Sequence, residues 1–272
     1  MVSVPWVSGP CADPRLPALA GEWAVGCSAL KADRAQNLRT GERITLRHAA
    51  EHVALADGVV YGKPGLWKLE EGGTLRQKEV LRAREFEQLA TDGTIVALTT
   101  EQDVQVGDLF GNRRRHLLPA PAPWYPPAVG AGRVAWVVHD GDEGIWWLEP
   151  GAREATPLAD GEGHERHVAL SGTHVAWIED RAVVVQDLST GEERRLRADA
   201  HTARGLTLEG GIACWEQWTG TDVDVACSDG VTVQRPRHQR NPSRHGRWLM
   251  VVEEGQALVL EFPQPAVDTL GL

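Results

Sequence analysis

Short runs of alternating apolar and polar residues fill this chain, and turns centred on glycine separate them. The pattern is clearest over residues 167–199, where HVALSG, HVAWIED and AVVVQDL follow one another and STGEERRLRAD completes the unit. Alternation of this kind is typical of half-buried β-strands, and no sustained 3.6-residue periodicity competes with it. We therefore predict four short strands here. Residues 133–160 repeat the same order with RVAWVVHD, GIWWLEP and REATPLAD.

The unit recurs along the whole chain, and each copy is marked by a glycine in the turn before an apolar strand. These glycines are Gly21, Gly58, Gly93, Gly132, Gly172, Gly210 and Gly246. Their successive spacings are 37, 35, 39, 40, 38 and 36 residues. Four short strands repeated at this period are typical of a β-propeller blade. We predict an all-β, seven-bladed propeller with four-stranded antiparallel blades, or a six-bladed one if the irregular first unit is not a blade.

The two ends of the chain are expected to meet in one blade. The sequence contains no distinct capping repeats, so a closed ring is favoured over an open solenoid. Residues 247–262 supply two strands, RWLMVVEE and ALVLEF, with a third expected near Val267, and the N-terminal VSVPWV is expected to complete that last sheet. Residues 1–272 would then form a single propeller domain.

The order of strand, glycine turn, VAW-like strand and DL-TGE-like hairpin resembles the propeller repeats of TolB-like proteins, within the wider WD40-like superfamily. The best matches are HVALSGTHVAWIEDRAVVVQDLSTGEERRL and AVGAGRVAWVVHDGDEGIWWLEPG. The WD dipeptide of the WD40 blade itself is absent. The resemblance implies a propeller fold, an envelope or surface location, and binding of a partner or ligand more often than catalysis.

Charge and hydropathy narrow the classes of partner. The chain has 28 Lys and Arg against 38 Asp and Glu, a net charge of −10, which argues against a general nucleic-acid binder. No apolar run approaches the roughly 18 residues of a membrane span. We expect a monomer that binds no nucleic acid, crosses no membrane and carries no cofactor. The 11 Trp residues are interpreted mainly as packing between blades.

The four cysteines bear on location. Cys214 and Cys227 flank two alternating strands around a turn at residues 219–222, so they are expected to lie opposite each other and form a disulfide. Cys11 and Cys27 are expected to tie the N-terminal segment to the first blade in the same way. Disulfides indicate an extracytoplasmic protein, periplasmic or at the cell surface, whose signal peptide has been removed. The alternative is four free thiols in a cytoplasmic protein.

In a propeller, the connectors that enter the innermost strands gather around one mouth of the central channel. The candidate ligand-binding residues at these positions are Arg15, His52, Glu87, Trp124, Tyr125, Arg166, His167, Arg204 and Arg240, which Asn241 follows. Several Arg side chains at one opening favour an anionic ligand, and Trp124 with Tyr125 would add a stacking face. Alternatively, these Arg side chains pair with Glu51, Glu87 and Glu165 and only line a wet channel.

Three short patterns bear on metal or catalytic chemistry. His48-x-x-Glu51-His52 matches the inverted zinc-peptidase pattern, but that chemistry needs a helix, and the repeat predicts a strand and a connector here. His164 and His167 have a spacing compatible with a metal. The acidic cluster at residues 140–143 is interpreted as a solvated hairpin tip. No motif indicates an activated nucleophile, and no catalytic residue or metal ligand is assigned.

The leading hypothesis is a non-catalytic propeller that holds a peptide, protein or glycan at its channel mouth. Whether it is an enzyme is left open. The first alternative is a propeller enzyme that acts as a lyase on an acidic carbohydrate, with channel Arg and His residues neutralising the carboxylate and moving the proton. A lectin with one sugar site per blade is the second.

Overall fold

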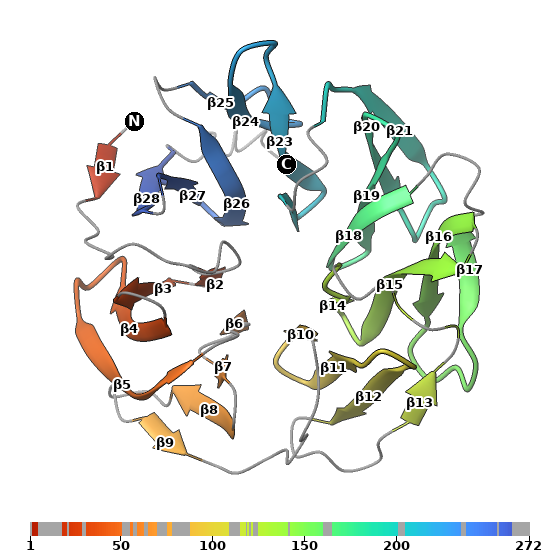
Figure 1. Cartoon of the computed structure of the whole chain (residues 1–272), viewed down its shortest axis with the longest axis horizontal. Helices are drawn as coiled ribbons and strands as arrows, with labels where there is room; N and C mark the ends of the chain where they lie inside the picture. Colours follow the sequence, from red (N-terminus) through yellow and green to blue (C-terminus); the bar gives the residue numbers. More distant parts are fainter. Residues whose placement is uncertain are drawn as a thin grey trace, which may run out of the picture.

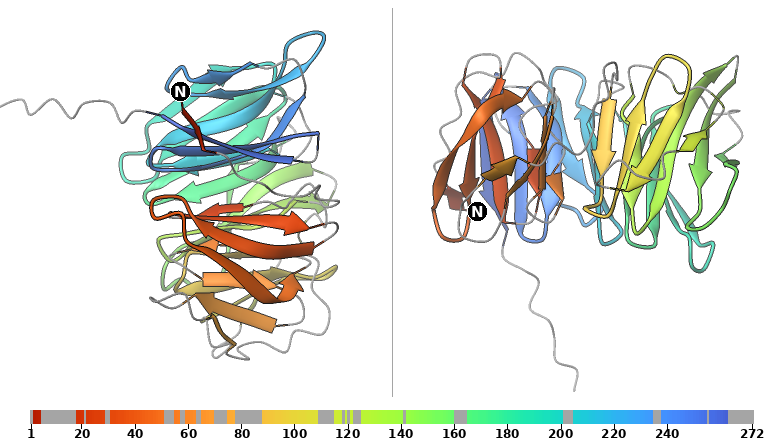
Figure 2. Two further views of the ribbon diagram at one scale, coloured as in Figure 1. Left: turned by 90° about the vertical axis from the view of Figure 1, so that its left-hand side faces the viewer. Right: turned by 90° about the horizontal axis from the view of Figure 1, so that it is seen from below.

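The computed structural model of the chain describes residues 2–4, 18–20, 22–28, 31–50, 55–56, 59–62, 65–69, 75–77, 88–108, 115–117, 119, 121, 125–140, 142–159, 165–200, 205–234, 238–254 and 256–262. Their strands form seven four-stranded antiparallel sheets. The sheets succeed one another around a central axis (Figure 1), and Figure 2 shows the same ring from two sides. The predicted all-β propeller with four-stranded antiparallel blades is confirmed.

We number the sheets in chain order. The first contains β2 (Ala18–Ala20), β3 (Trp23–Ser28), β4 (Lys31–Asn37) and β5 (Arg43–Ala50). The second contains β6 (Leu55–Ala56), β7 (Val59–Gly62), β8 (Gly65–Leu69) and β9 (Leu75–Gln77). The third contains β10 (Gln88–Thr91), β11 (Ile95–Thr99), β12 (Val104–Asp108) and β13 (Arg115–Leu117). The fourth contains β14 (Ala128–Gly130), β15 (Arg133–Asp140), β16 (Asp142–Leu148) and β17 (Thr156–Ala159).

The remaining three sheets follow the same plan. The fifth contains β18 (Glu165–Ser171), β19 (His174–Glu179), β20 (Ala182–Asp187) and β21 (Glu193–Arg197). The sixth contains β22 (Leu206–Glu209), β23 (Ile212–Trp218), β24 (Val223–Cys227) and β25 (Thr232–Val233). The seventh contains β26 (Gln239–His245), β27 (Trp248–Glu253), β28 (Gln256–Glu261) and, from the other end of the chain, β1 (Val2–Val4).

The seventh sheet joins the two ends of the chain, as predicted. Strand β1 pairs antiparallel with β28, and Val2 lies opposite Glu261 while Val4 lies opposite Val259. The N-terminal segment therefore supplies the outer strand of the last sheet and closes the ring. The further strand expected near Val267 falls outside the described residues.

The marker glycines lie in the turn between the first and second strands of their sheets. Five of them fall in the described ranges, and all five have a positive φ: Gly93, Gly132, Gly172, Gly210 and Gly246, with φ from 53° to 89°. A residue with a Cβ rarely adopts this left-handed conformation, so the turn requires glycine and the sequence marks each unit with one. Gly21 and Gly58 lie outside the described residues.

The core lies between neighbouring sheets, because the two faces of each sheet pack against different neighbours. Between the fourth and fifth sheets, Ile145 and Val137 pack with Val175 and Leu170. Met250 of the seventh sheet packs with the first sheet in the same way. Tryptophans of the second strands contribute to these layers, as expected of packing residues. The buried ones are Trp136, Trp177, Trp215 and Trp248.

Hydrogen bonds between adjacent sheets reinforce this packing at the glycine turns. The backbone N–H of Gly132 donates to Asp92 Oδ2 of the preceding sheet at 2.9 Å. The same contact recurs further along the ring, from Gly210 to Ser171 Oγ at 3.1 Å and from Gly246 to Glu209 Oε1 at 3.4 Å. Each bond satisfies a turn N–H and fixes one blade against the next. The part of the chain described here contains no helix with the length and apolarity needed to cross a bilayer.

Candidate functional site

The first strand of each sheet lies nearest the axis (Figure 1). We call the end of the ring at which the chain enters these innermost strands the mouth face. Buried polar side chains occupy the beginning of three of them: Gln88 on β10, Glu165 on β18 and Gln239 on β26. Glu165 is 2% exposed and Gln239 is fully buried. Three buried polar side chains therefore stand at equivalent ends of the innermost strands.

The sixth sheet carries a buried carboxylate at the same end. Glu216 on β23 is fully buried, and its N–H donates to the carbonyl of Gly205 at 3.1 Å. A Cβ added at Gly205 would lie 2.6 Å from Cγ of Glu216 and 2.8 Å from Cδ of Pro242. The glycine therefore makes room for the acidic side chain where β22 begins, and for a proline from the seventh sheet.

The fifth sheet places an arginine and a histidine at this end, and the segment before β14 of the fourth sheet adds a tyrosine. The β18–β19 register shifts between Arg166 and Val168, so His167 is the extra residue of a β-bulge. His167 has a φ of 43° and is buried, and its ring meets the ring of Tyr125 edge-on, with centroids 4.8 Å apart and planes at 66°. Tyr125 also packs against the apolar layer between the fourth and fifth sheets. A bulge re-aims a side chain, and bulges are over-represented next to functional sites.

A second bulge lies at the beginning of β26. The β26–β27 register shifts between Arg240 and Ser243, and Pro242, which has no N–H to donate to the ladder, lies within the irregular stretch. Arg240 is exposed. Two of the innermost strands therefore interrupt their pairing at the arginines that the sequence nominated for the mouth. Arg166 directly precedes His167 in the chain. An arginine suits a carboxylate, and an aromatic pair suits a flat or aliphatic group.

The structure describes four of the nine predicted mouth residues. Tyr125, Arg166 and His167 lie together at the fourth and fifth sheets, and Arg240 lies at the equivalent end of the seventh. The other five, Arg15, His52, Glu87, Trp124 and Arg204, lie outside the described residues. Sequence reasoning missed Glu216. The signal that could have found it is a single charged residue inside the otherwise apolar run IACWEQW.

The described residues include parts of all three short patterns that bear on metal or catalytic chemistry. His48 lies on strand β5, so this stretch is not the helix that the zinc-peptidase chemistry needs, while Glu51 and His52 lie outside the described residues. Asp140 pairs with Asp142 across the β15–β16 hairpin, as expected of a hairpin tip. His164, the proposed companion of His167, is not among the described residues. Within the described ranges, no three His, Cys, Asp or Glu side chains are grouped so that they could hold a metal.

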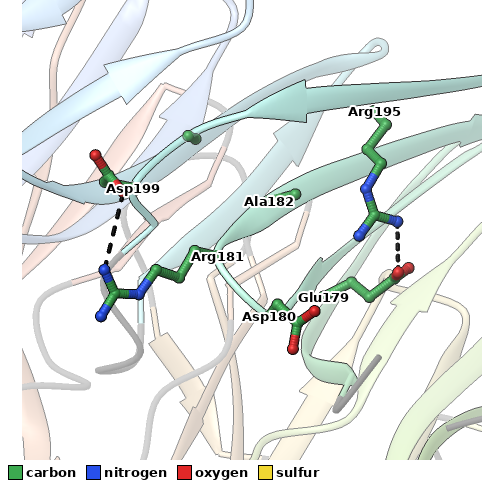
Figure 3. Close-up of a pocket in the computed structure, with 7 residues that line it drawn as sticks. Glu179, Asp180, Arg181, Ala182, Arg195 and Asp199 are labelled. Carbon is green, nitrogen blue, oxygen red and sulfur yellow. Dashed lines mark hydrogen bonds and ion pairs between the residues drawn. The ribbon is translucent and has the colours of Figure 1, made fainter. Parts of the chain in front are cut away.

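A pocket of about 500 Å³ opens at the mouth-face end of the fifth sheet (Figure 3). The β19–β20 hairpin forms one wall with Glu179, Asp180 and Arg181. The end of β21 and the segment after it supply Arg195 and Asp199, and Ala182 and Ala198 also line the pocket. Two ion pairs lie in it, Arg195 with Glu179 and Arg181 with Asp199. No sequence signal marks this pocket, because residues 180–182 (DRA) and 197–199 (RAD) resemble ordinary turn residues.

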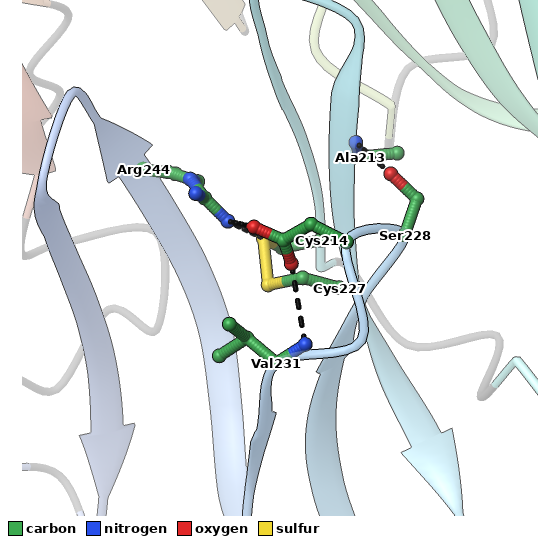
Figure 4. The surroundings of a disulfide bond; sticks show 7 residues. Ala213, Cys214, Cys227, Ser228, Val231 and Arg244 are labelled. Carbon is green, nitrogen blue, oxygen red and sulfur yellow. Dashed lines mark hydrogen bonds and ion pairs between the residues drawn. A yellow bond between two sulfur atoms is a disulfide. The ribbon is translucent and has the colours of Figure 1, made fainter. Parts of the chain in front are cut away.

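The predicted Cys214–Cys227 disulfide is present in the sixth sheet (Figure 4). The two residues are direct register partners on β23 and β24, and the turn between them is closed by the Thr219 N–H donating to the Asp222 carbonyl at 2.9 Å. Arg244 of the neighbouring sheet lies 3.8 Å from the Cys214 sulfur. Cys27 lies on β3, and Cys11 is outside the described residues, so that predicted pairing stays a prediction.

No protein-family profile matches the sequence, and no curated protein matches it. Solved structures do. BamB from Moraxella catarrhalis is 13% identical, with a TM-score of 0.56 over 96% of this chain and 100% of that one. YCF48 bound to D1 peptide is 11% identical, with a TM-score of 0.60 over 97% of both chains. Virginiamycin B lyase from Staphylococcus aureus is 10% identical, with a TM-score of 0.61 over 91% of this chain and 95% of that one.

These structures are propellers of the WD40-like kind. At 10–13% identity they show the fold alone, and the resemblance to propeller repeats is confirmed at that level.

Proposed function

We propose that this protein is a non-catalytic binding propeller that holds a peptide, or an extended segment of a partner protein, at the mouth face of its ring. The proposal is carried by one observation: Arg166 and His167 stand in a β-bulge at the beginning of β18, and His167 is locked against the ring of Tyr125. The ligand class that fits is a peptide with a carboxylate and an adjacent aromatic or aliphatic group.

The site is suited to binding because it is rigid before a ligand arrives. His167 is 4% exposed and takes a left-handed backbone conformation, which persists only where the surrounding structure holds it. Tyr125 is held by the apolar layer between the fourth and fifth sheets. A pre-ordered site loses little side-chain entropy on binding, so a few contacts suffice for useful affinity.

A solved relative in fold supports the choice of ligand. YCF48 has been captured with a peptide, which demonstrates that a propeller of this size can hold one. Fold likeness does not transfer a partner, so the ligand here is inferred from Tyr125, Arg166 and His167 and not from that complex. A glycan is the alternative ligand, and the experiment below tests one in parallel with the peptides.

We also propose an extracytoplasmic location, periplasmic or at the cell surface. The Cys214–Cys227 disulfide supports it, because reducing conditions in the cytoplasm disfavour structural disulfides.

A lyase acting on an acidic carbohydrate is the second candidate function, and two observations favour it. A buried histidine, His167, follows an arginine at the mouth, and virginiamycin B lyase shares the fold. In such a β-elimination Arg166 would neutralise the uronate carboxylate and His167 would take the proton from the adjacent carbon. A carbon–carbon double bond would form as the glycosidic C–O bond breaks, and the departing oxygen would take up a proton from water. Turnover that disappears in His167→Ala distinguishes this candidate from binding alone.

The test uses the full-length protein and a library of decapeptides that carry either a free C-terminal carboxylate or an amide. We expect selective retention of free-carboxylate peptides with an apolar residue nearby, and weakened retention by Arg166→Ala. Polygalacturonate is run in parallel, with the ultraviolet absorbance of an unsaturated product as the readout. Equal retention of carboxylate and amide peptides would contradict the binding proposal, and formation of the unsaturated product would favour the lyase.

A further inference from the structure

The pocket at the end of the fifth sheet lies directly outward from the proposed binding site. Glu179, which lines the pocket, is the register partner of Glu165, the first residue of the innermost strand, and Arg166 and His167 follow Glu165. Ala182, also in the lining, is in turn the partner of Glu179 on the next strand. Mouth and pocket therefore share one end of one blade.

The pocket is formed from backbone that is fixed on both sides. The Ala200 N–H donates to the Arg181 carbonyl at 3.0 Å, which ties the segment after β21 to the β19–β20 hairpin. The Trp218 N–H donates to the Asp199 carbonyl at 2.8 Å, which ties the same segment to the sixth sheet. Asp199 is thus presented from a segment bonded to two blades, and the pocket exists without a ligand.

The Arg195–Glu179 ion pair forms part of the pocket wall. The Arg195 guanidinium donates to Glu179, and this hydrogen bond, opposed by burial, raises the pKa of Arg195. Glu179 is further held by the indole N–H of Trp177, 3.4 Å away. The charges of Arg195 and Glu179 neutralise each other, so this pair contributes to the shape of the pocket and little to its net charge.

The other pair is loose. Arg181 Nη1 lies 4.0 Å from Asp199 Oδ1, with side chains 77% and 68% exposed, and an exposed pair at this distance contributes little stability. Asp180, exposed in the adjacent turn with a φ of 53°, adds a second carboxylate to the same opening. Figure 3 shows Arg181 reaching toward Asp199 while the Asp180 carboxylate lies on the Glu179 side. The carboxylates of Asp180 and Asp199 together with the guanidinium of Arg181 give this part of the pocket a net charge of −1.

We propose that this pocket receives the basic side chain, arginine or lysine, of the bound peptide. The assignment rests on the proposed function for the peptide, and adds that the peptide is bipolar, with its carboxylate at Arg166 and its cation between Asp180 and Asp199. The pocket opens between the β19–β20 hairpin and the end of β21, so about two to three strand spacings, roughly 10–15 Å, separate the middle of its opening from the innermost strand. An extended chain at about 3.3 Å per residue covers this in three to four residues.

The first arm of the experiment probes the pocket alone. N-acetylarginine amide and its uncharged isostere N-acetylcitrulline amide are titrated into the full-length protein, and backbone amide shifts at Asp180, Ala182 and Asp199 are followed by NMR. We expect the arginine compound to bind about tenfold tighter than the citrulline compound, and this preference to vanish in Asp180→Asn/Asp199→Asn. The matched control is Glu192→Gln/Glu193→Gln, which removes two charges from the opposite end of the same blade. Equal affinities, or a preference that the control also loses, would overturn the assignment.

The second arm separates this inference from the proposed function. Carboxylate peptides with arginine placed one to six residues away are compared with the same peptides carrying alanine. A gain confined to spacings of three to four residues, lost in Asp180→Asn/Asp199→Asn, supports the subsite. Peptides that bind through the carboxylate with no gain from arginine would overturn the subsite and leave the mouth proposal standing. Arginine amide bound in the pocket with no peptide bound at the mouth would support the subsite and contradict the proposed function.

Discussion

Ser243 and Leu19 are 224 residues apart in the chain and are joined by two hydrogen bonds. The Leu19 N–H donates to Ser243 Oγ at 3.2 Å, and the Ser243 hydroxyl donates to the Leu19 carbonyl at 3.3 Å. Strand β26 of the last sheet is thereby fixed to strand β2 of the first. Together with the β1–β28 pairing, this contact closes the ring.

Replacement of Ser243 by alanine is expected to loosen this closure. The change leaves a strand N–H and C=O without their side-chain partner, so we expect a loss of about 1 kcal/mol in the free energy of unfolding. Urea denaturation measures it. Ser189→Ala is the matched control, because the Ser189 hydroxyl donates to Asp187 within an exposed turn. A Ser243→Ala variant no less stable than the control would contradict a role in closure.

The contact between Glu209 and the Gly246 turn is expected to depend on pH. Burial favours a raised pKa for Glu209, but the His245 side chain, the Gly246 N–H and Arg244 outweigh it and lower that pKa. A carboxylate with a lowered folded pKa stabilises the protein above its unfolded value, about 4.3, and that contribution is lost as the pH falls through the folded pKa. Glu209→Gln should therefore cost a few tenths to about 1 kcal/mol at neutral pH.

The measurement for Glu209 is the thermal midpoint of wild type and variant from pH 7 to pH 3. The difference between them is expected to shrink below about pH 4 as the wild-type carboxylate takes up its proton. Glu192→Gln, in an exposed turn, serves as the control. A difference that stays constant across this range would show that the charge of Glu209 is not what holds the two blades together.

Alanine at Gly205 is expected to disturb the packing around Glu216 at the mouth-face end of the sixth sheet. The added methyl would lie within 2.6–2.8 Å of Glu216 and Pro242 atoms, so the strand must move, at a cost of about 1–3 kcal/mol. A double-mutant cycle with Glu216→Ala checks the cause: if the carboxylate side chain is the obstacle, the two changes are not additive. Strict additivity in denaturant unfolding would assign the cost elsewhere.

Reduction of the Cys214–Cys227 bond is expected to lower stability without abolishing the fold. The bond closes a loop with a sequence separation of 13, and cross-linking a loop of this size stabilises by about 3 kcal/mol. Guanidinium unfolding of Cys214→Ala/Cys227→Ala against wild type measures it. Cys11→Ser/Cys27→Ser separates this bond from the other predicted one, and a Cys214→Ala/Cys227→Ala variant as stable as wild type would contradict the prediction.

Most of the fold could be predicted from local sequence patterns. Positive-φ turns need glycine, half-buried strands need alternation, and Cys214 and Cys227 stand equally far from their turn, so strands, turns and the disulfide could all be predicted from neighbouring residues. The packing of Glu216 beside Gly205 and Pro242 could not be predicted from neighbouring residues, because it depends on how two sheets approach each other. The bulge at His167 also has no local signature, since its sequence reads as an ordinary strand.

The proposed function depends on the binding of a peptide carboxylate at Arg166. Isothermal titration of wild type, Arg166→Ala and Arg39→Ala with the best free-carboxylate peptide from the library measures this binding. Arg39 forms an exposed ion pair with Glu22 at the opposite end of the ring, so its variant removes the same charge away from the mouth. We predict at least a tenfold loss of affinity for Arg166→Ala, as expected for a lost charge-assisted contact, and none for Arg39→Ala. Equal affinities for all three proteins would show that Arg166 does not hold the carboxylate.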